Sequence, residues 1–527
     1  MPGALTWDPT PAGGDQSTFR GGLNPSADGA IAALQALAAG AGISPSALFY
    51  LGDSQLGYSA GANTLTAASY DSNTGVLTLT QSGHGLTNGC FVQLGARAAP
   101  QWNVYGKSCT VVSSSIFTVQ LAAGLSGQPI AADMRWTKAG TSNKPACVGD
   151  VQYLTGARGR VVRNASVTGE TWAQIRARVA LEVAPVMTGG GIVIIQGGHN
   201  DSLTGPVPVA QSISDMQGCV SDLKALGLRV IIINNTPFGS GYATTAARVH
   251  LLEQNRAMAA LARPGTVAVV DAFGVANDPA SLCNALTGYV QSDNLHWSGK
   301  TSRGIAQLIA NIINLWLPPV QRLPGSFLDC YDVTNNPNST NKMQNALFQT
   351  ATGGTLNNSI AGAAASQLTL ATDQGSGASF TGSVQATSWG GGGNSQKIAW
   401  ASLTFSTNTV RMYTSSQHAR FSAGQKIRFA CRVKTTGLGG SAFINDLYAK
   451  MYITVDGNAL TLALFNDSSL PAAQNDQQDW DGLFESDLIY LPVGAALQNL
   501  QWEIGAVLTG TLAGSIEVGQ VDLIQVA

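Results

Sequence analysis

The chain has 527 residues and a formal net charge of −2, and only 11% of its residues are charged against 44% that are hydrophobic. This length suits two to four domains with sizeable cores, while the charged share is well below the roughly 25% of a typical globular protein. The near-neutral charge excludes a general electrostatic attraction to nucleic acid or to an anionic membrane surface.

The seven cysteines stand singly, with no C-x-x-C pair. This spacing argues against a zinc site and against a complete disulfide framework. No stretch is long and apolar enough for a transmembrane helix, and the start of the chain lacks the pattern of a signal peptide. We therefore expect no cofactor, no metal ion and no membrane partner.

In chain order, residues 1–25 are rich in proline and glycine and favour coil. Residues 26–28 (Ser-Ala-Asp) have the composition of a helix cap, ahead of an apolar helix that ends at Gly40. An apolar run over 47–51 then stops at Gly52-Asp53-Ser54, which predicts a buried parallel strand followed by a turn. Open α/β sheets place their ligand-binding groups at such strand ends, so Ser54 is a candidate nucleophile.

The sequence pattern changes between residues 60 and 139. Short alternating segments separated by turns such as Asn73-Thr74-Gly75 predict a small, β-barrel-like all-β module. Its stretch 82–89 is similar to small β modules of phage tail and bacterial surface proteins. The module would be an insertion into the α/β domain just after the nucleophile, where loops tolerate extra chain.

The α/β pattern resumes with strands expected over 160–163, 191–195, 228–233 and 266–270, and helices over 170–184, 208–226, 243–262 and 298–316. This alternation predicts a parallel sheet with helices on both faces. Roughly nine strand-like segments follow in the last third of the chain and predict an antiparallel β-sandwich. The expected domains are a catalytic domain over 1–59 and 140–320, the inserted module over 60–139, and a jelly-roll, carbohydrate-binding-like sandwich over 326–527.

Five aromatic residues of that last domain could stack on sugars, although such residues more often lie in the core. They are Trp389, Trp400, Tyr413, Trp480 and Trp502.

Polar clusters follow the predicted strands at Gly169, at Asn200 and, just before the last helix, at Asp293 and His296. Acyl transfer needs a nucleophile, a base, an acid that orients the base, and donors for the oxyanion. Ser54 supplies the hydroxyl, His296 is the candidate base, and Asp293 is placed to orient it. The predicted oxyanion hole consists of the backbone N–H groups of Ser54 and Gly169 and the side-chain amide of Asn200.

These four motifs, in this order, resemble the SGNH (GDSL-type) hydrolase superfamily, whose four naming residues correspond here to Ser54, Gly169, Asn200 and His296. The resemblance covers about residues 26–318. It implies a three-layer, flavodoxin-like sheet and the hydrolysis of esters, often acetyl groups on sugars. Gln55 replaces the leucine of the longer Gly-Asp-Ser-Leu motif, and we expect no chemical role at that position. The β insertion is atypical of the family.

The sequence therefore predicts a serine esterase that removes acyl groups, O-acetyl above all, from a polysaccharide or glycan. It would act outside the cell or on a virion, either as a phage tail component or as a secreted enzyme. Homo-oligomerisation and attachment to a virion tail both stay open. Two alternatives remain: a lipase or general carboxylesterase of the same fold, and a non-catalytic glycan-binding adhesin or tail-fibre protein.

Overall fold

A computed structural model of the chain describes residues 46–56, 63–96, 99–139, 147–156, 158–203, 207–281, 283–318, 323–324, 330–332, 334, 336, 339, 341–357, 360–373, 380–387, 389, 393–437, 443–465, 479, 481–486 and 488–526. The coil and helix expected over residues 1–41, and Trp480, lie outside the described residues.

The α/β domain is built on five parallel strands: β1 (Ser46–Gly52), β9 (Gly159–Asn164), β10 (Ile192–Gln196), β11 (Arg229–Ile233) and β12 (Val267–Val270). They lie in the order β12-β11-β10-β1-β9. Numbered along the chain this is the 2-1-3-4-5 order of flavodoxin-like sheets. The order reverses between β1 and β10, so the segments that follow these two strands meet at the point where such sheets bind ligands.

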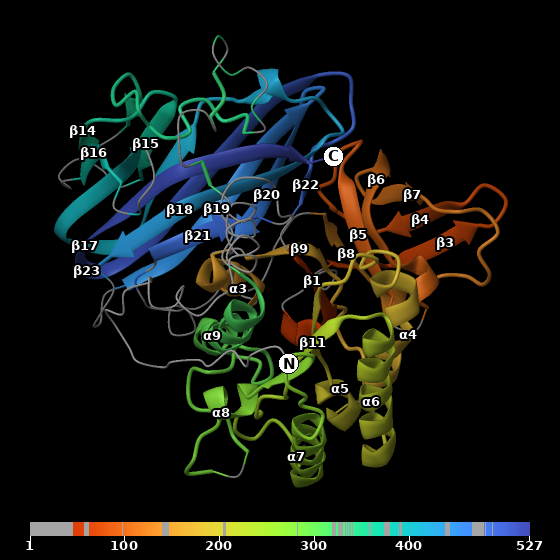
Figure 1. Ribbon diagram of the computed structural model, residues 1–527. Coiled ribbons are helices and arrows are strands. Elements are labelled where there is room, and N and C mark those ends of the chain that lie inside the picture. Colours follow the sequence, from red (N-terminus) through yellow and green to blue (C-terminus); the bar gives the residue numbers. More distant parts are fainter. Residues whose placement is uncertain are drawn as a thin grey trace, which may run out of the picture.

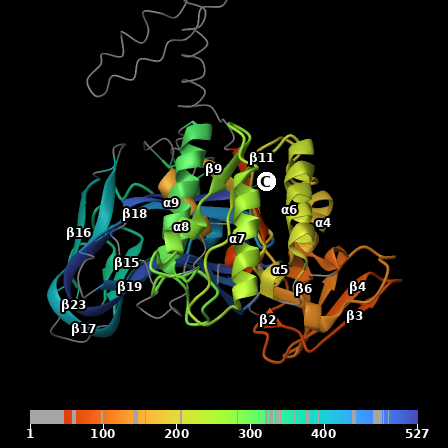
Figure 2. The same cartoon turned by 90° about the horizontal axis from the view of Figure 1, so that it is seen from below.

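Helices cover both faces of this sheet, which makes three layers (Figures 1 and 2). On one face α3 (Cys147–Thr155), α8 (Ala272–Ala276) and α9 (Gly299–Trp316) pack on Leu48 and Tyr50 of β1. On the other face α4 (Trp172–Ala177), α6 (Val209–Ala225) and α7 (Thr245–Ala259) pack with Phe49 and Leu51. Successive residues of β1 are thus buried on opposite faces, as the continuous apolar run of the strand requires.

Two parts of this domain differ from the sequence-based expectation. The helix expected over 170–184 ends at Ala177 and is followed by a π-helical turn, Val179–Val183. The cluster around Asn200 forms a short helix, α5 (His199–Leu203), directly after β10. Both segments carry polar residues of the site described below.

The inserted module is an antiparallel sheet of seven strands: β2 (Asn63–Thr64), β3 (Ala67–Asp71), β4 (Val76–Thr80), β5 (Phe91–Ala96), β6 (Val104–Ser113), β7 (Ile116–Gln120) and β8 (Met134–Lys138). Leu77, Phe117 and Trp136 are buried in its core. Its first and last strands pair, with Asn63 opposite Trp136, so the chain enters and leaves the module at nearly the same place.

The C-terminal part is an eleven-stranded network: β13 (Thr355–Leu356), β14 (Ile360–Gly362), β15 (Leu368–Thr372), β16 (Phe380–Ala386), β17 (Asn394–Thr414), β18 (Lys426–Thr436), β19 (Phe443–Val455), β20 (Asn458–Phe465), β21 (Asp481–Glu485), β22 (Ile489–Tyr490) and β23 (Leu497–Val526). The antiparallel expectation fails for two short pairs, β13 with β15 and β14 with β16, which are parallel. Trp400 and Trp502 are buried, so these two rings belong to the core and are not sugar-stacking platforms.

The three parts pack against one another (Figure 1). In the C-terminal part, the ring of Tyr490 lies against Phe91 and Tyr105 of the inserted module, with ring centroids 5.1 and 6.0 Å apart. Glu485 pairs with Arg160 of β9 at 3.3 Å. The C-terminal part therefore touches both of its neighbours.

Within the described residues, no helix is both long and apolar enough to cross a membrane. The same residues contain no group of three or more His, Cys, Asp or Glu side chains placed to hold a metal ion. All seven cysteines are buried.

Candidate active site

Ser54 lies directly beyond β1, as the first residue of a 3-10 turn, Ser54–Leu56. The strand approaches β10 closely here, because a Cβ atom on Gly52 would lie only 2.3 Å from the carbonyl oxygen of Gln196. Only glycine fits such an approach. The buried side chain of Leu56 anchors the far end of the turn in the sheet core. The hydroxyl of Ser54 is thus presented at the switch point of the sheet.

His296 and Asp293 meet Ser54 from the loop ahead of α9. The Nε2 atom of His296 lies 2.8 Å from the Oγ of Ser54, and its Nδ1 atom lies 2.6 Å from Oδ2 of Asp293. The other carboxylate oxygen of Asp293 accepts the backbone N–H groups of Leu295 and His296, each at 3.0 Å. The structure therefore joins the three predicted residues in one continuous chain of hydrogen bonds.

The electrostatics of Asp293 suit an orienting carboxylate. Partial burial acts to raise its pKa, but the hydrogen bonds from the His296 ring and from the two backbone N–H groups outweigh it and hold the pKa well below its usual range. Asp293 is then ionised at neutral pH and accepts the proton on Nδ1 of His296. This tautomer leaves Nε2 able to accept the hydroxyl proton of Ser54.

The two remaining predicted residues lie beside this chain of bonds. Gly169 has φ of +83°, a left-handed conformation that favours glycine. The Nδ2 atom of Asn200, on α5, donates to the carbonyl oxygen of Glu170 at 2.9 Å and to Oδ2 of Asp53 at 3.1 Å. Asn200 therefore connects the Gly169 loop with the neighbour of Ser54. Both of its amide hydrogens point at these acceptors, so an oxyanion would have to share one of them.

Asp53 is a site residue that sequence reasoning missed, although its place in the Gly-Asp-Ser motif was a signal. It is fully buried and accepts the backbone N–H of Gln55 at 2.9 Å besides the amide of Asn200. Burial raises its pKa to about 7; the Gln55 N–H opposes this shift, the nearby Asp201 carboxylate adds to it, and the Asn200 amide opposes it. Asp53 holds the turn that presents Ser54 and the amide of Asn200 in a fixed relation.

Gln55, for which we expected no chemical role, has a structural role in the site. Its side chain is buried, and its Nε2 atom donates to the carbonyl oxygen of Leu295 at 2.9 Å. Leu295 precedes His296 in the loop that carries the base. Gln55 thus ties the serine turn to the histidine loop, a contact between distant parts of the chain that no local pattern reveals.

The variant Gln55→Leu tests this tie. A leucine fills a similar volume but cannot donate to Leu295, so the histidine loop loses one hydrogen bond. We expect kcat/KM for a small ester to fall about three- to tenfold, the worth of one ordinary hydrogen bond. Steady-state kinetics check this result, and an unchanged kcat/KM would show that the loop does not depend on Gln55.

Arg178 connects the ends of β1 and β9 beside the site. Its guanidinium, which is only 1% exposed, donates to Oε2 of Glu170 at 2.6 Å, to the carbonyl oxygen of Gly52 at 3.2 Å and to that of Ala165. Burial alone would lower the pKa of Arg178, but Glu170 and Glu182 raise it above its ordinary value. This buried cation therefore holds the segment before Ser54 and the segment around Gly169 together.

His199, next to Asn200, has a structural role. Its ring is buried against Phe238, and its Nε2 atom lies 2.9 Å from the carbonyl oxygen of Thr236. Burial lowers its pKa to about 4, so the ring is neutral at physiological pH. Asp201 accepts the backbone N–H of Trp172 at the start of α4, at 3.1 Å. These contacts fix α5 and, with it, the position of Asn200.

Two buried carboxyl groups, Asp53 and Asp201, make the stability of the fold depend on pH. Burial raises the pKa of Asp53 to about 7 and of Asp201 to about 6. A carboxyl group whose pKa is higher in the folded than in the unfolded chain contributes its full stability below the unfolded value, near 4, and loses it as the pH rises through the folded value. These groups should therefore weaken the fold progressively between about pH 4 and pH 7.

We expect Asp53→Asn to flatten this dependence. Its Tm should fall less than that of the wild type between pH 5 and pH 9, by about 5 °C, because one buried group no longer ionises. Thermal unfolding followed by circular dichroism across this range measures the difference. Parallel curves for the two proteins would mean that Asp53 does not titrate in this range.

Comparison with known proteins agrees with this architecture. Residues 131–303 match the model of the GDSL-like Lipase/Acylhydrolase family. The matched segment contains Gly169, Asn200, Asp293 and His296, whereas Ser54 precedes it on the far side of most of the inserted module. This match supports the resemblance of the α/β domain to SGNH-type, GDSL-like acylhydrolases.

Among solved structures, the chain is similar to a GDSL-like lipase from Bacteroides thetaiotaomicron, with 19% identity, a TM-score of 0.27, and coverage of 33% of this chain and 86% of that one. It is also similar to a member of the lipolytic protein G-D-S-L family from Veillonella parvula, with 14% identity, a TM-score of 0.25, and coverage of 29% and 80%. A comparison with curated proteins gives no match.

Proposed function

We propose that this protein is a serine esterase that removes acyl groups, O-acetyl groups above all, from a polysaccharide or glycan. The observation that carries the proposal is the chain of contacts from Ser54 through His296 to Asp293, with distances of 2.8 and 2.6 Å. A nucleophile, a base and an orienting acid in this geometry are what acyl transfer requires.

In this mechanism, the Oγ of Ser54 attacks the ester carbonyl carbon while Nε2 of His296 takes its proton. Asp293 stabilises the imidazolium that forms. The negative charge on the former carbonyl oxygen is met by the backbone N–H groups of Ser54 and Gly169 and by the amide of Asn200. His296 then gives its proton to the departing sugar oxygen, which leaves an acyl group on Ser54.

Water completes the cycle by the same route in reverse. His296 takes a proton from the water, the resulting hydroxide attacks the acyl carbon, and the proton passes to Ser54 Oγ as the acyl–oxygen bond breaks. The products are the free acid and the regenerated serine. Each step needs only the residues already named.

Two features support a glycan ester over a long-chain ester. The chain is poor in charge and rich in glycine and uncharged residues, which suits surfaces that work through hydrogen bonds. The two β parts pack on the α/β domain and offer surfaces on which a polymer can lie. We place the enzyme outside the cell or on a virion, where such a polymer would be met and where the β parts would also serve attachment to a phage tail.

The test is an acetate-release screen over acetylated polysaccharides, with long-chain p-nitrophenyl esters assayed in parallel. Acetate release from one or a few glycans with little turnover of long chains supports the proposal. The reverse preference favours a lipase or general carboxylesterase of the same fold. If a serine-reactive fluorophosphonate does not label the protein and no ester is cleaved, the non-catalytic adhesin is the correct reading.

A further inference from the structure

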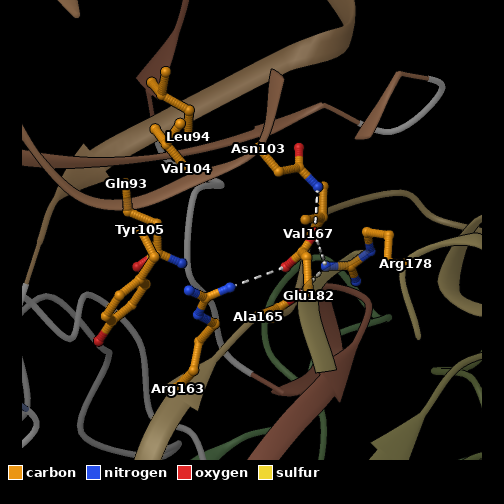
Figure 3. Close-up of a pocket in the computed structure, with 10 residues that line it drawn as sticks. All are labelled: Gln93, Leu94, Asn103, Val104, Tyr105, Arg163, Ala165, Val167, Arg178 and Glu182. Carbon is orange, nitrogen blue, oxygen red and sulfur yellow. Dashed lines mark hydrogen bonds and ion pairs between the residues drawn. The ribbon is translucent and has the colours of Figure 1, made fainter. Parts of the chain in front are cut away.

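Glu182, on the π-helical turn after α4, is shared between the inserted module and the α/β domain (Figure 3). Its Oε1 atom accepts the side-chain amide of Asn103 of the module at 2.6 Å and the guanidinium of Arg178 at 3.4 Å. Its Oε2 atom lies 3.9 Å from the guanidinium of Arg163, on β9. One carboxylate therefore joins a module side chain to two arginines of the α/β domain.

On the module side, Asn103 is firmly placed. It follows the 3-10 turn Pro100–Trp102, whose Trp102 ring is fully buried in the module core. Its Oδ1 atom accepts the backbone N–H of Ala96, at the end of β5, at 2.5 Å. The amide that reaches Glu182 is thus positioned by the module itself.

On the α/β side, Arg178 extends this contact to the site. It donates to Glu170, whose backbone carbonyl accepts the amide of Asn200 at 2.9 Å, and to Gly52, two residues before Ser54. Arg178 and Glu170 are 1% and 0% exposed, so water does not screen these contacts. The hydrogen-bonded path runs from Asn103 through Glu182, Arg178 and Glu170 to the predicted oxyanion hole.

Two further details make the position of Arg178 sensitive to its partners. The Nε atom of Arg178 has no hydrogen-bond partner among the described residues, so its two terminal nitrogens make the hydrogen bonds that hold the guanidinium. A cavity of about 20 Å³ adjoins the group, lined in part by Asn103, Glu182 and Arg178, which is room for about one water. The side chains can therefore shift when one contact is removed.

We propose that Asn103 is a positioning residue for the esterase: held by the module, it fixes Glu182 and, through Arg178, the loop that bears Gly169 and Glu170 beside Asn200. The inference rests on the function proposed above. In this role, the inserted module affects the chemical step directly, whether or not it also binds a polymer.

The test uses the full chain, with p-nitrophenyl acetate as a substrate too small to need a platform. We expect Asn103→Ala to lower kcat about tenfold, with KM within about twofold of the wild-type value. A misplaced oxyanion donor should reduce kcat by less than the complete loss of that donor would. The rate of inactivation by a small phosphonate should fall with kcat, because its tetrahedral adduct needs the same hole.

Asn88→Ala is the matched control. The Oδ1 atom of Asn88 accepts a backbone N–H as that of Asn103 does, from Val111 at 2.6 Å, but this bond lies wholly within the module. We expect its kcat to equal that of the wild type. Equal losses in the two variants would overturn the inference in favour of general module stability.

Glu182→Gln is a second, independent variant. It keeps an oxygen for Asn103 but removes the charge that faces Arg178, so kcat should fall to a similar extent. The double variant should lose no more than the worse single one, because both act along one path. Unchanged kcat in folded Asn103→Ala and Glu182→Gln would overturn the inference and leave the esterase intact. Full activity of a Ser54→Ala control would instead refute the proposed function.

Discussion

Ser54→Ala is expected to lower kcat for ester hydrolysis by about 10⁴-fold or more, while KM and the unfolding temperature stay close to those of the wild type. The Oγ atom of Ser54 forms the bond to the acyl group in the covalent intermediate, and alanine has no hydroxyl for His296 to deprotonate. The hydroxyl of Ser54 contacts His296 at 2.8 Å. Its loss should leave the rest of the site unchanged, because Asp53 and Leu56 hold the turn that carries residue 54. Initial rates on p-nitrophenyl acetate and on the best acetylated glycan measure the loss.

Ser202→Ala is a suitable companion variant. Ser202 lies on α5 beside the site and is buried, and its hydroxyl donates to the carbonyl oxygen of His199 at 2.8 Å. Its loss should change kcat by less than about threefold. Retention of a hundredth or more of the wild-type rate by Ser54→Ala would show that another group is the nucleophile.

Arg178→Met is expected to lower the free energy of unfolding by about 3–5 kcal/mol, the cost of breaking a buried ion pair from one side. Methionine occupies much of the same space, but Glu170 loses its cation at 2.6 Å, and the carbonyl oxygens of Gly52 and Ala165 lose their donor. Urea unfolding followed by tryptophan fluorescence measures the change.

Arg176→Met provides the comparison, two residues earlier in the same segment. Arg176 pairs with Asp222 at 2.8 Å, but the two side chains are 41% and 42% exposed. Exposed pairs contribute at most about 1 kcal/mol, so this variant should unfold almost as the wild type does. A similar loss in both variants would mean that burial does not determine the strength of the Arg178 contacts.

The parts of the fold that follow from local periodicity could be predicted from the sequence. Four of the five parallel strands have apolar runs that end in turn-forming or polar residues, and α6, α7 and α9 lie within a few residues of their expected ranges. The five predicted site residues stand at strand or loop ends, and parallel strands bring such ends to one edge of a sheet. Their convergence follows from topology and needs no knowledge of side-chain contacts.

What the sequence did not reveal depends on contacts between distant segments. Gln55 contacts Leu295, Arg178 contacts Gly52, and Asn103 contacts Glu182; none of these pairs lies within one element or one motif. The helix α5 was also missed, because five residues are too few to show a helical period. The parallel pairs in the C-terminal part escaped prediction because strand segments alone do not specify their partners.

The placement of β1 has a consequence for how the chain folds. Leu48 of this central strand pairs with Val161 and Ile192, both of which follow the entire inserted module, so the sheet cannot close until the module has been synthesised. Closing a flexible loop costs more entropy as the loop lengthens. Because β2 pairs with β8, a module that has already folded holds its two ends together. The connection between β1 and β9 then has the entropy cost of a short loop. Early folding of the module would therefore speed the docking of β1 between its neighbours.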